Sequence, residues 1–189
     1  MQRLFVPVSV VLLASACGTP APETSEAEIT RATARADDAM LALQTRLIEA
    51  LTTELEKNGA TGAIHVCRDA APAITSAVSS EQGVTVARTS HRLRNPDNVP
   101  PDWAREIVER GAGTQFEDAT EHVIDLGDRV GVLRPIGTLG MCTTCHGDEA
   151  AMGPELRELI AESYPDDEAT GFEVGDLRGW LWAEVPRGE

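Results

Sequence analysis

The residues with the types and spacing to do chemistry are concentrated in the run Cys142-Thr143-Thr144-Cys145-His146. Two thiols with two residues between them can add to vinyl groups on neighbouring pyrroles of a haem, because that spacing sets about the separation both thioethers need. The histidine that follows then lies under the iron, where its imidazole can bind as an axial ligand. The run therefore predicts one covalently bound haem c, attached at Cys142 and Cys145, with His146 as a ligand of the iron.

Three other uses of a Cys-X-X-Cys pair remain open from the spacing alone. A structural zinc ion needs four ligands, usually from two such pairs, and this chain has one pair. A redox dithiol of the thioredoxin kind would follow the first strand of a βαβ unit, whereas this pair comes late in the chain. A plain disulfide between Cys142 and Cys145, with His146 incidental, is the third alternative.

The N-terminal residues predict export. Arg3 precedes an apolar run from Leu4 to Leu13, and the small residues at 14–16 lead directly into Cys17. This pattern resembles the signal peptide and lipobox of bacterial lipoproteins, in which the cysteine is acylated and becomes the new N-terminus. We predict a signal peptide over residues 1–16 and a lipid on Cys17, with ordinary cleavage nearby as the alternative. The protein would then be periplasmic or otherwise extracytoplasmic, the compartment in which c-type haem is attached, and would contact the membrane only through its lipid.

Composition restricts the partners of the chain. Its 189 residues include 16 Lys+Arg and 31 Asp+Glu, which gives a formal net charge of −15. A protein that binds nucleic acid needs a basic stripe, so nucleic acid is excluded as a partner. Residues 17–27 are rich in Pro, Thr and Glu and predict a tether, and residues 28–189 suffice for one domain with one core.

Helical patterns come first along the chain and strand patterns follow. Apolar residues recur every three or four positions from Ile29 to Leu55, which predicts a helix that Asn58-Gly59 ends. Residues 62–83 predict a second helix that bends or restarts near Pro72. Strands are expected at 84–89, 121–126, 129–136 and 178–185, and short helices at 101–110 and 154–163. This order indicates an α+β fold with an antiparallel sheet. A four-helix cytochrome of the c′ type is the rival fold, against which the strand-like residues 121–136 argue.

The second axial ligand has several candidates. Cys67 is the thiol left over when Cys17, Cys142 and Cys145 are assigned, and ligation of iron as thiolate would protect it from oxidation in an exported protein. Alternatively, Cys67 is a small apolar side chain buried in the core, as free cysteines ordinarily are. The other candidates are His65, His91, His122, Met40, Met141 and Met152.

Four runs resemble, in this order, a bacterial family of single-haem, c-type PAS-like domains. They are GAIHVCRDAAPAI, VARTSHRLRNPDNVPPDW, RPIGTLGMCTTCHG and SYPDDEATGFEVGDLRGWL. The family was long catalogued as a domain of unknown function and occurs as stand-alone periplasmic proteins and as input modules of histidine kinases and chemoreceptors. The resemblance implies a PAS-like α+β fold with a long N-terminal helix, haem on Cys142 and Cys145, and His146 and Cys67 as axial ligands. His65 stands out as a residue that could compete with Cys67 for the iron.

Together these features predict a haem protein that senses redox state or a small gas and signals to a partner protein. The alternative is a periplasmic electron carrier, because a small acidic haem protein suits docking to a basic surface. A haem enzyme such as a peroxidase is less favoured, since two protein ligands leave no open face on the iron, and no catalytic residue is predicted. Arg88, Arg92 and Arg94 are candidates for pairing with haem carboxylates, with ordinary ion pairs in a solvated loop as the alternative.

Overall fold

The computed structural model describes residues 25–188. The predicted signal peptide over residues 1–16, the predicted lipid site at Cys17 and most of the predicted tether lie outside the described residues. The last residues of that tether, from Ser25, already belong to the first helix.

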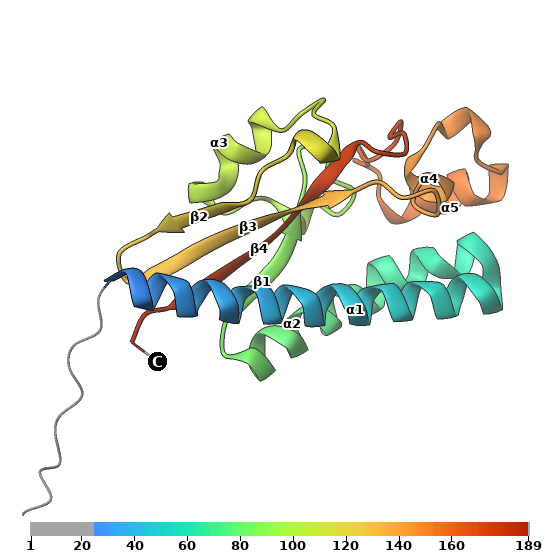
Figure 1. Ribbon diagram of the computed structural model, residues 1–189. Coiled ribbons are helices and arrows are strands. Elements are labelled where there is room, and N and C mark those ends of the chain that lie inside the picture. The colour runs from blue at the N-terminus through green and yellow to red at the C-terminus, as the bar shows by residue number, and fades with distance from the viewer. Residues whose placement is uncertain (1–24, 189) are drawn as a thin grey trace, which may run out of the picture.

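Four strands form one antiparallel sheet in the order β1-β4-β3-β2. The strands are β1 (Thr85–Thr89), β2 (His122–Asp125), β3 (Arg129–Gly137) and β4 (Leu177–Pro186). Each overlaps a strand expected from the sequence, and the flanking helices complete an α+β fold (Figure 1). The predicted fold class is therefore confirmed.

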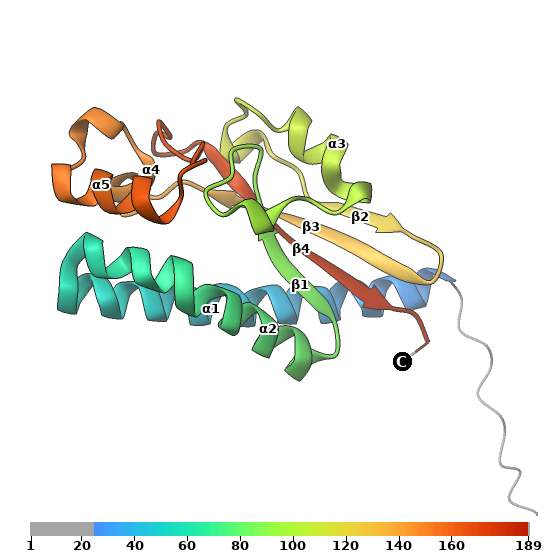
Figure 2. The same ribbon diagram turned by 180° about the vertical axis from the view of Figure 1, so that it is seen from behind.

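A long N-terminal helix, α1 (Ser25–His65), passes along one face of the sheet (Figures 1 and 2). Its apolar stripe is buried with the side chains that β1, β3 and β4 turn to that face. The shared core includes Ala36, Met40, Leu43, Val86, Val130, Val132, Leu181 and Ala183. The stripe that predicted the helix is thus the contact that holds it on the sheet.

Gly59 interrupts this helix. Its φ of 66° and ψ of −164° lie where glycine alone is unstrained, so the first helical segment ends there as predicted. The chain then turns back, and the segment after Gly59 lies beside the end of the segment before it (Figures 1 and 2). We call the two segments together the α1 hairpin.

The returning segment continues through a π-helical turn, η1 (Val66–Ala70), into α2 (Ala71–Gln82). The sequence places the irregularity near Pro72, whereas the structure places it just before that proline. Gly83, in the left-handed conformation, ends α2.

The other face of the sheet is covered by α3 (Asp102–Arg110), whose Ala104 and Val108 pack with Leu133 and Trp180. Two further helices, α4 (Thr143–His146) and α5 (Pro154–Ser163), lie beyond the end of the sheet and over the α1 hairpin (Figure 1). A second small core joins them to the hairpin, and it contains Ile64, Met152, Leu156, Ile160 and Tyr164. Within residues 25–188, no helix combines the length and apolar character needed to span a membrane.

The sheet carries a β-bulge next to α4. Ile136 pairs with Gly179 and Gly137 with Leu177, so Arg178 is the extra residue on β4. A bulge of this kind bends the strand and re-aims the side chain of the extra residue. A Cβ on Gly179 would lie 2.3 Å from the carbonyl oxygen of Thr89, so only glycine allows β1 and β4 to approach this closely. The Arg178-Gly179 step therefore directs an arginine toward the end of the sheet where the cysteine pair lies.

Candidate functional site

The Cys-X-X-Cys-His run forms one helical turn. The amides of Cys145 and His146 donate to the carbonyl oxygen of Cys142 at 3.2 and 2.9 Å. Cys142 and Cys145 are both half-buried free thiols. Because residues three apart share a face of a helix, both sulfurs are presented on one side of the turn. The geometry suits attachment of one planar group through two thioethers.

Gly147 lets the chain leave this turn abruptly. A Cβ at this position would lie 2.5 Å from the carbonyl oxygen of Thr143, so a larger residue would displace the turn. Beyond it, the amides of Gly171 and Phe172 donate to the carbonyl oxygens of Gly147 and His146 at 2.7 and 2.8 Å. The loop before β4 is thereby hydrogen-bonded to the end of the helical turn formed by residues 142–146, which we call the cysteine turn.

The imidazole of His146 is oriented by the same loop. Its Nδ1 lies 2.7 Å from the carbonyl oxygen of Ala169, which can only accept, so Nδ1 carries the proton and donates. Its ring meets the ring of Phe172 edge to face, with centroids 6.5 Å apart. Burial, helped by nearby arginines, holds the pKa of His146 well below its usual value. A neutral imidazole with Nδ1 engaged leaves Nε2 free to bind a metal, as ligating histidines require.

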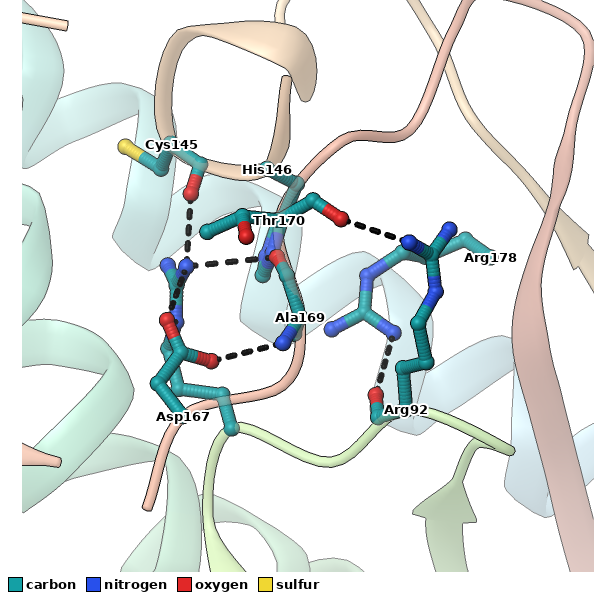
Figure 3. Close-up of polar contacts among 8 residues, drawn as sticks. Arg92, Cys145, His146, Asp167, Ala169, Thr170 and Arg178 are labelled. Carbon is teal, nitrogen blue, oxygen red and sulfur yellow. Dashed lines mark hydrogen bonds and ion pairs between the residues drawn. The ribbon is translucent and has the colours of Figure 1, made fainter. Parts of the chain in front are cut away.

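A buried ion pair ties this loop to the cysteine turn. Arg94 Nη2 donates to Asp167 Oδ2 at 2.8 Å and to the carbonyl oxygen of Cys145 at 2.7 Å, while Asp167 Oδ1 accepts from the Ala169 amide at 2.8 Å (Figure 3). The two side chains are only 7% and 8% exposed. Of the two alternatives for Arg94 in the sequence analysis, the structure shows an ion pair, although it is a buried one and not one in a solvated loop.

We expect Asp167→Asn to lower the free energy of unfolding by about 3–5 kcal/mol, because it leaves the Arg94 guanidinium buried without its counter-charge. Urea unfolding at pH 7 measures the loss. Asp166→Asn is the matched control, since Asp166 is exposed and its replacement should change stability by less than about 0.5 kcal/mol. Equal effects of the two substitutions would show that the Arg94–Asp167 pair does not hold the loop.

Cys67 approaches the cysteine turn from the α1 hairpin. It lies in the π-helical turn Val66–Ala70 and is half-buried. Burial raises the pKa of Cys145, and negative charge on Cys67 raises it further, so the two sulfurs are within electrostatic reach of each other. Burial and the same charge on Cys67 raise the pKa of Tyr164 to about 12. Isolated π-helical turns are frequent at functional sites, and the sequence analysis missed this one.

The other candidates for the second axial position are spread over the molecule. His65 is exposed, with Nδ1 3.1 Å from Arg68 Nη2 and 3.8 Å from Asp69 Oδ2. Met40 is buried in the core under the sheet, and Met152 in the core between α5 and the hairpin. Met141 is exposed and His122 contacts Trp180, while His91 contacts the ring of Phe172. These positions favour Cys67 over His65, and the assignment of Cys67 remains a prediction.

Two surface hollows border the site without containing it. One of about 620 Å³ lies between the α1 hairpin and α5 and includes His65 in its wall. The other, of about 320 Å³, includes Arg94 and Tyr164. Neither wall includes the predicted haem residues, so the case for this site depends on the cysteine turn and its polar contacts. Among residues 25–188, no three His, Cys, Asp or Glu side chains are grouped to hold a bare metal ion.

Comparison with known proteins gives one family and one solved structure. The model of the Tll0287-like family matches residues 22–186. The crystal structure of the cyanobacterial heme-protein Tll0287 is similar with a TM-score of 0.56 and 21% sequence identity, over 87% of this chain and 97% of that chain. At this identity the similarity concerns the fold, which agrees with the α+β architecture described above. No curated protein matches the chain.

Proposed function

The chain belongs to the Tll0287-like family, and from that premise we propose that it is a haem protein. We propose one haem c, held by thioethers from Cys142 and Cys145, with His146 Nε2 as an axial ligand. The observation that carries this proposal is the helical turn with two free thiols on one side and a neutral imidazole whose Nδ1 is already engaged. Haem, when bound, supplies an iron that can change its oxidation state and its ligands.

The protein residues fit such a group on its other face as well. Cys67 supplies a sulfur within electrostatic reach of Cys145, from a helical segment that packs opposite α5. A thiolate there would be a strong anionic ligand. It would also explain a free thiol in a chain whose N-terminal residues predict export.

Within this assignment we propose a sensing role in the periplasm, with a lipid on Cys17 as the membrane anchor. The supporting observation is the position of Cys67 in the π-helical turn Val66–Ala70, where the α1 hairpin continues into α2. A π-helical turn holds one residue more than the α-helical turn it replaces, so its conversion would shift the hairpin relative to α2. A change in the bonding of Cys67 would thus be converted into a movement that a partner protein can detect.

A periplasmic electron carrier is the second candidate. The net charge of −15 favours it, because an acidic surface suits a basic redox partner. A carrier would keep the same structure in both oxidation states, whereas a sensor would not.

Hydrogen exchange on the full chain with its haem separates the two roles. For a sensor we expect the amides of residues 60–82 to exchange at least about tenfold faster in the reduced than in the oxidised protein, because a bond from Cys67 to the iron would weaken on reduction and release this segment. Peptides from α3 serve as the internal control and should not change. Identical protection in both oxidation states, together with rapid electron exchange, would favour the carrier.

A further inference from the structure

Positive charge accumulates around His146 inside an acidic protein. Arg178 lies 4.8 Å from the centroid of the Phe172 ring, and that ring meets the ring of His146 edge to face. Arg94 donates to the carbonyl oxygen of Cys145, next to His146. Arg88 lies two residues before Ser90, whose hydroxyl oxygen accepts from Arg178. Arg92 joins them by stacking over the Phe172 ring, at 3.7 Å from its centroid. Among the described residues, Asp167 is the one carboxylate that forms an ion pair with any of these four arginines.

Two of the four arginines make polar contacts with the segment before β4. Arg94 is paired with Asp167, as described above. Arg92 donates from Nη1 to the carbonyl oxygen of Thr170 at 2.7 Å (Figure 3). Its guanidinium also covers the face of Phe172. Both therefore serve to hold the loop before β4.

Arg178 is directed into the same region by the β-bulge. Its Nη1 donates to Ser90 Oγ at 3.0 Å. The same nitrogen donates to the carbonyl oxygen of Arg92 at 3.4 Å (Figure 3). Within residues 25–188, its Nε and Nη2 donate to no protein group and no carboxylate is paired with it. Burial lowers the pKa of this guanidinium to about 10, which reflects the cost of a charge without a counter-charge.

Arg88, on the neighbouring strand β1, is the other of these arginines that has neither a described carboxylate partner nor a hydrogen bond to the segment before β4. It lies two residues after Val86 on β1, on the face that packs under the α1 hairpin. In the described part of the chain it makes neither a hydrogen bond nor an ion pair with another side chain. Burial lowers the pKa of this guanidinium too. A half-buried guanidinium that no hydrogen bond or ion pair satisfies is costly, so a carboxylate at this position would stabilise it.

We propose that Arg88 and Arg178 bind the two propionate carboxylates of the haem, one arginine to each carboxylate. This inference rests on the proposed function. Arg88 and Arg178 are the two of these four arginines that neither pair with a described carboxylate nor donate a hydrogen bond to the segment before β4, and they equal in number the two carboxylates of the porphyrin. The planar guanidinium fork matches a carboxylate in a bidentate way. The arginines would thus fix the rotation of the ring about the bonds to the cysteine turn, and they would place its acidic edge at the end of the sheet.

Resonance Raman spectroscopy of the covalent, full-length haem protein tests this assignment, because the bending bands of the propionates respond to hydrogen bonding at the carboxylates. We expect Arg178→Gln and Arg88→Gln each to shift these bands, and the double variant to shift both. Arg178→Lys and Arg88→Lys, which keep the charge, should shift them less. The matched control is Arg46→Gln, which removes an arginine of the exposed Arg46–Glu81 pair and should leave the bands unchanged.

A measurement without substitution covers the case in which a variant fails to fold. The full chain, produced without haem attachment, is titrated with hemin and with hemin dimethyl ester. We expect hemin to bind at least about tenfold more tightly, the difference that one lost charge-assisted hydrogen bond produces. A hemin affinity no greater than that of the ester overturns the inference, and so do unchanged propionate bands in both glutamine variants that carry covalent haem. If the chain never acquires covalent haem, that result would instead contradict the proposed function.

Discussion

Replacing Cys142 and Cys145 together by alanine is expected to abolish covalent haem in protein matured by a host that attaches c-type haem. Both sulfurs lie on one side of a single helical turn, and each supplies one thioether. Cys142→Ala or Cys145→Ala alone would leave one thioether, so haem should remain on the chain in reduced yield. Haem staining after denaturing electrophoresis measures the attachment, and the double variant should show none.

Cys67→Ala is the control for this experiment. It removes the third described thiol, and because Cys67 lies outside the helical turn the variant should keep covalent haem. Staining that persists in the Cys142→Ala/Cys145→Ala variant, or that disappears in Cys67→Ala alone, would contradict the assignment of the thioethers.

The same Cys67→Ala substitution is expected to change the spin state of the ferric protein. We expect the ferric protein to change almost completely from a low-spin to a high-spin or His/water spectrum, because alanine offers no ligand in place of the thiolate. Optical and electron paramagnetic resonance spectra of the oxidised protein report the change.

His65→Ala is the matched variant for the ligand assignment. His65 is exposed and in contact with Arg68 and Asp69, so its loss should leave the ferric spectrum unaltered. An unchanged low-spin spectrum in Cys67→Ala would show that another residue ligates the iron. A changed spectrum in His65→Ala would identify that residue as the histidine.

Much of the fold could be predicted because local signals decide it. The apolar stripe of α1 and the left-handed Gly59 mark a helix and its end, and the apolar, β-branched runs of β3 and β4 mark strands that are buried in the middle of the sheet. The reversal of the chain at Gly59 could not be predicted, since a glycine that ends a helix does not specify the direction of the next one. That direction is set by the core that Ile64 shares with α5.

Residue spacing predicted only the sequence-local part of the candidate site, whereas Cys67 was predicted from the left-over thiol and the family resemblance. Cys142, Cys145 and His146 are contiguous, so their spacing alone indicates the chemistry. The Arg94–Asp167 pair joins residues 73 positions apart, and no local pattern distinguishes it from a surface ion pair. The π-helical turn at Cys67 and the bulge at Arg178 arise from packing and strand register. The runs at residues 94–96 and 164–167 are far apart in the sequence, so their contact through the Arg94–Asp167 ion pair could not be predicted from either run.

Intact-mass spectrometry of the denatured protein from a host competent in cytochrome c maturation tests the central claim most directly. We predict the mass of the polypeptide plus one haem, with the Cys142→Ala/Cys145→Ala variant from the same host giving the polypeptide alone. A wild-type chain that shows the bare polypeptide mass under those conditions would contradict covalent haem attachment and the function proposed from it.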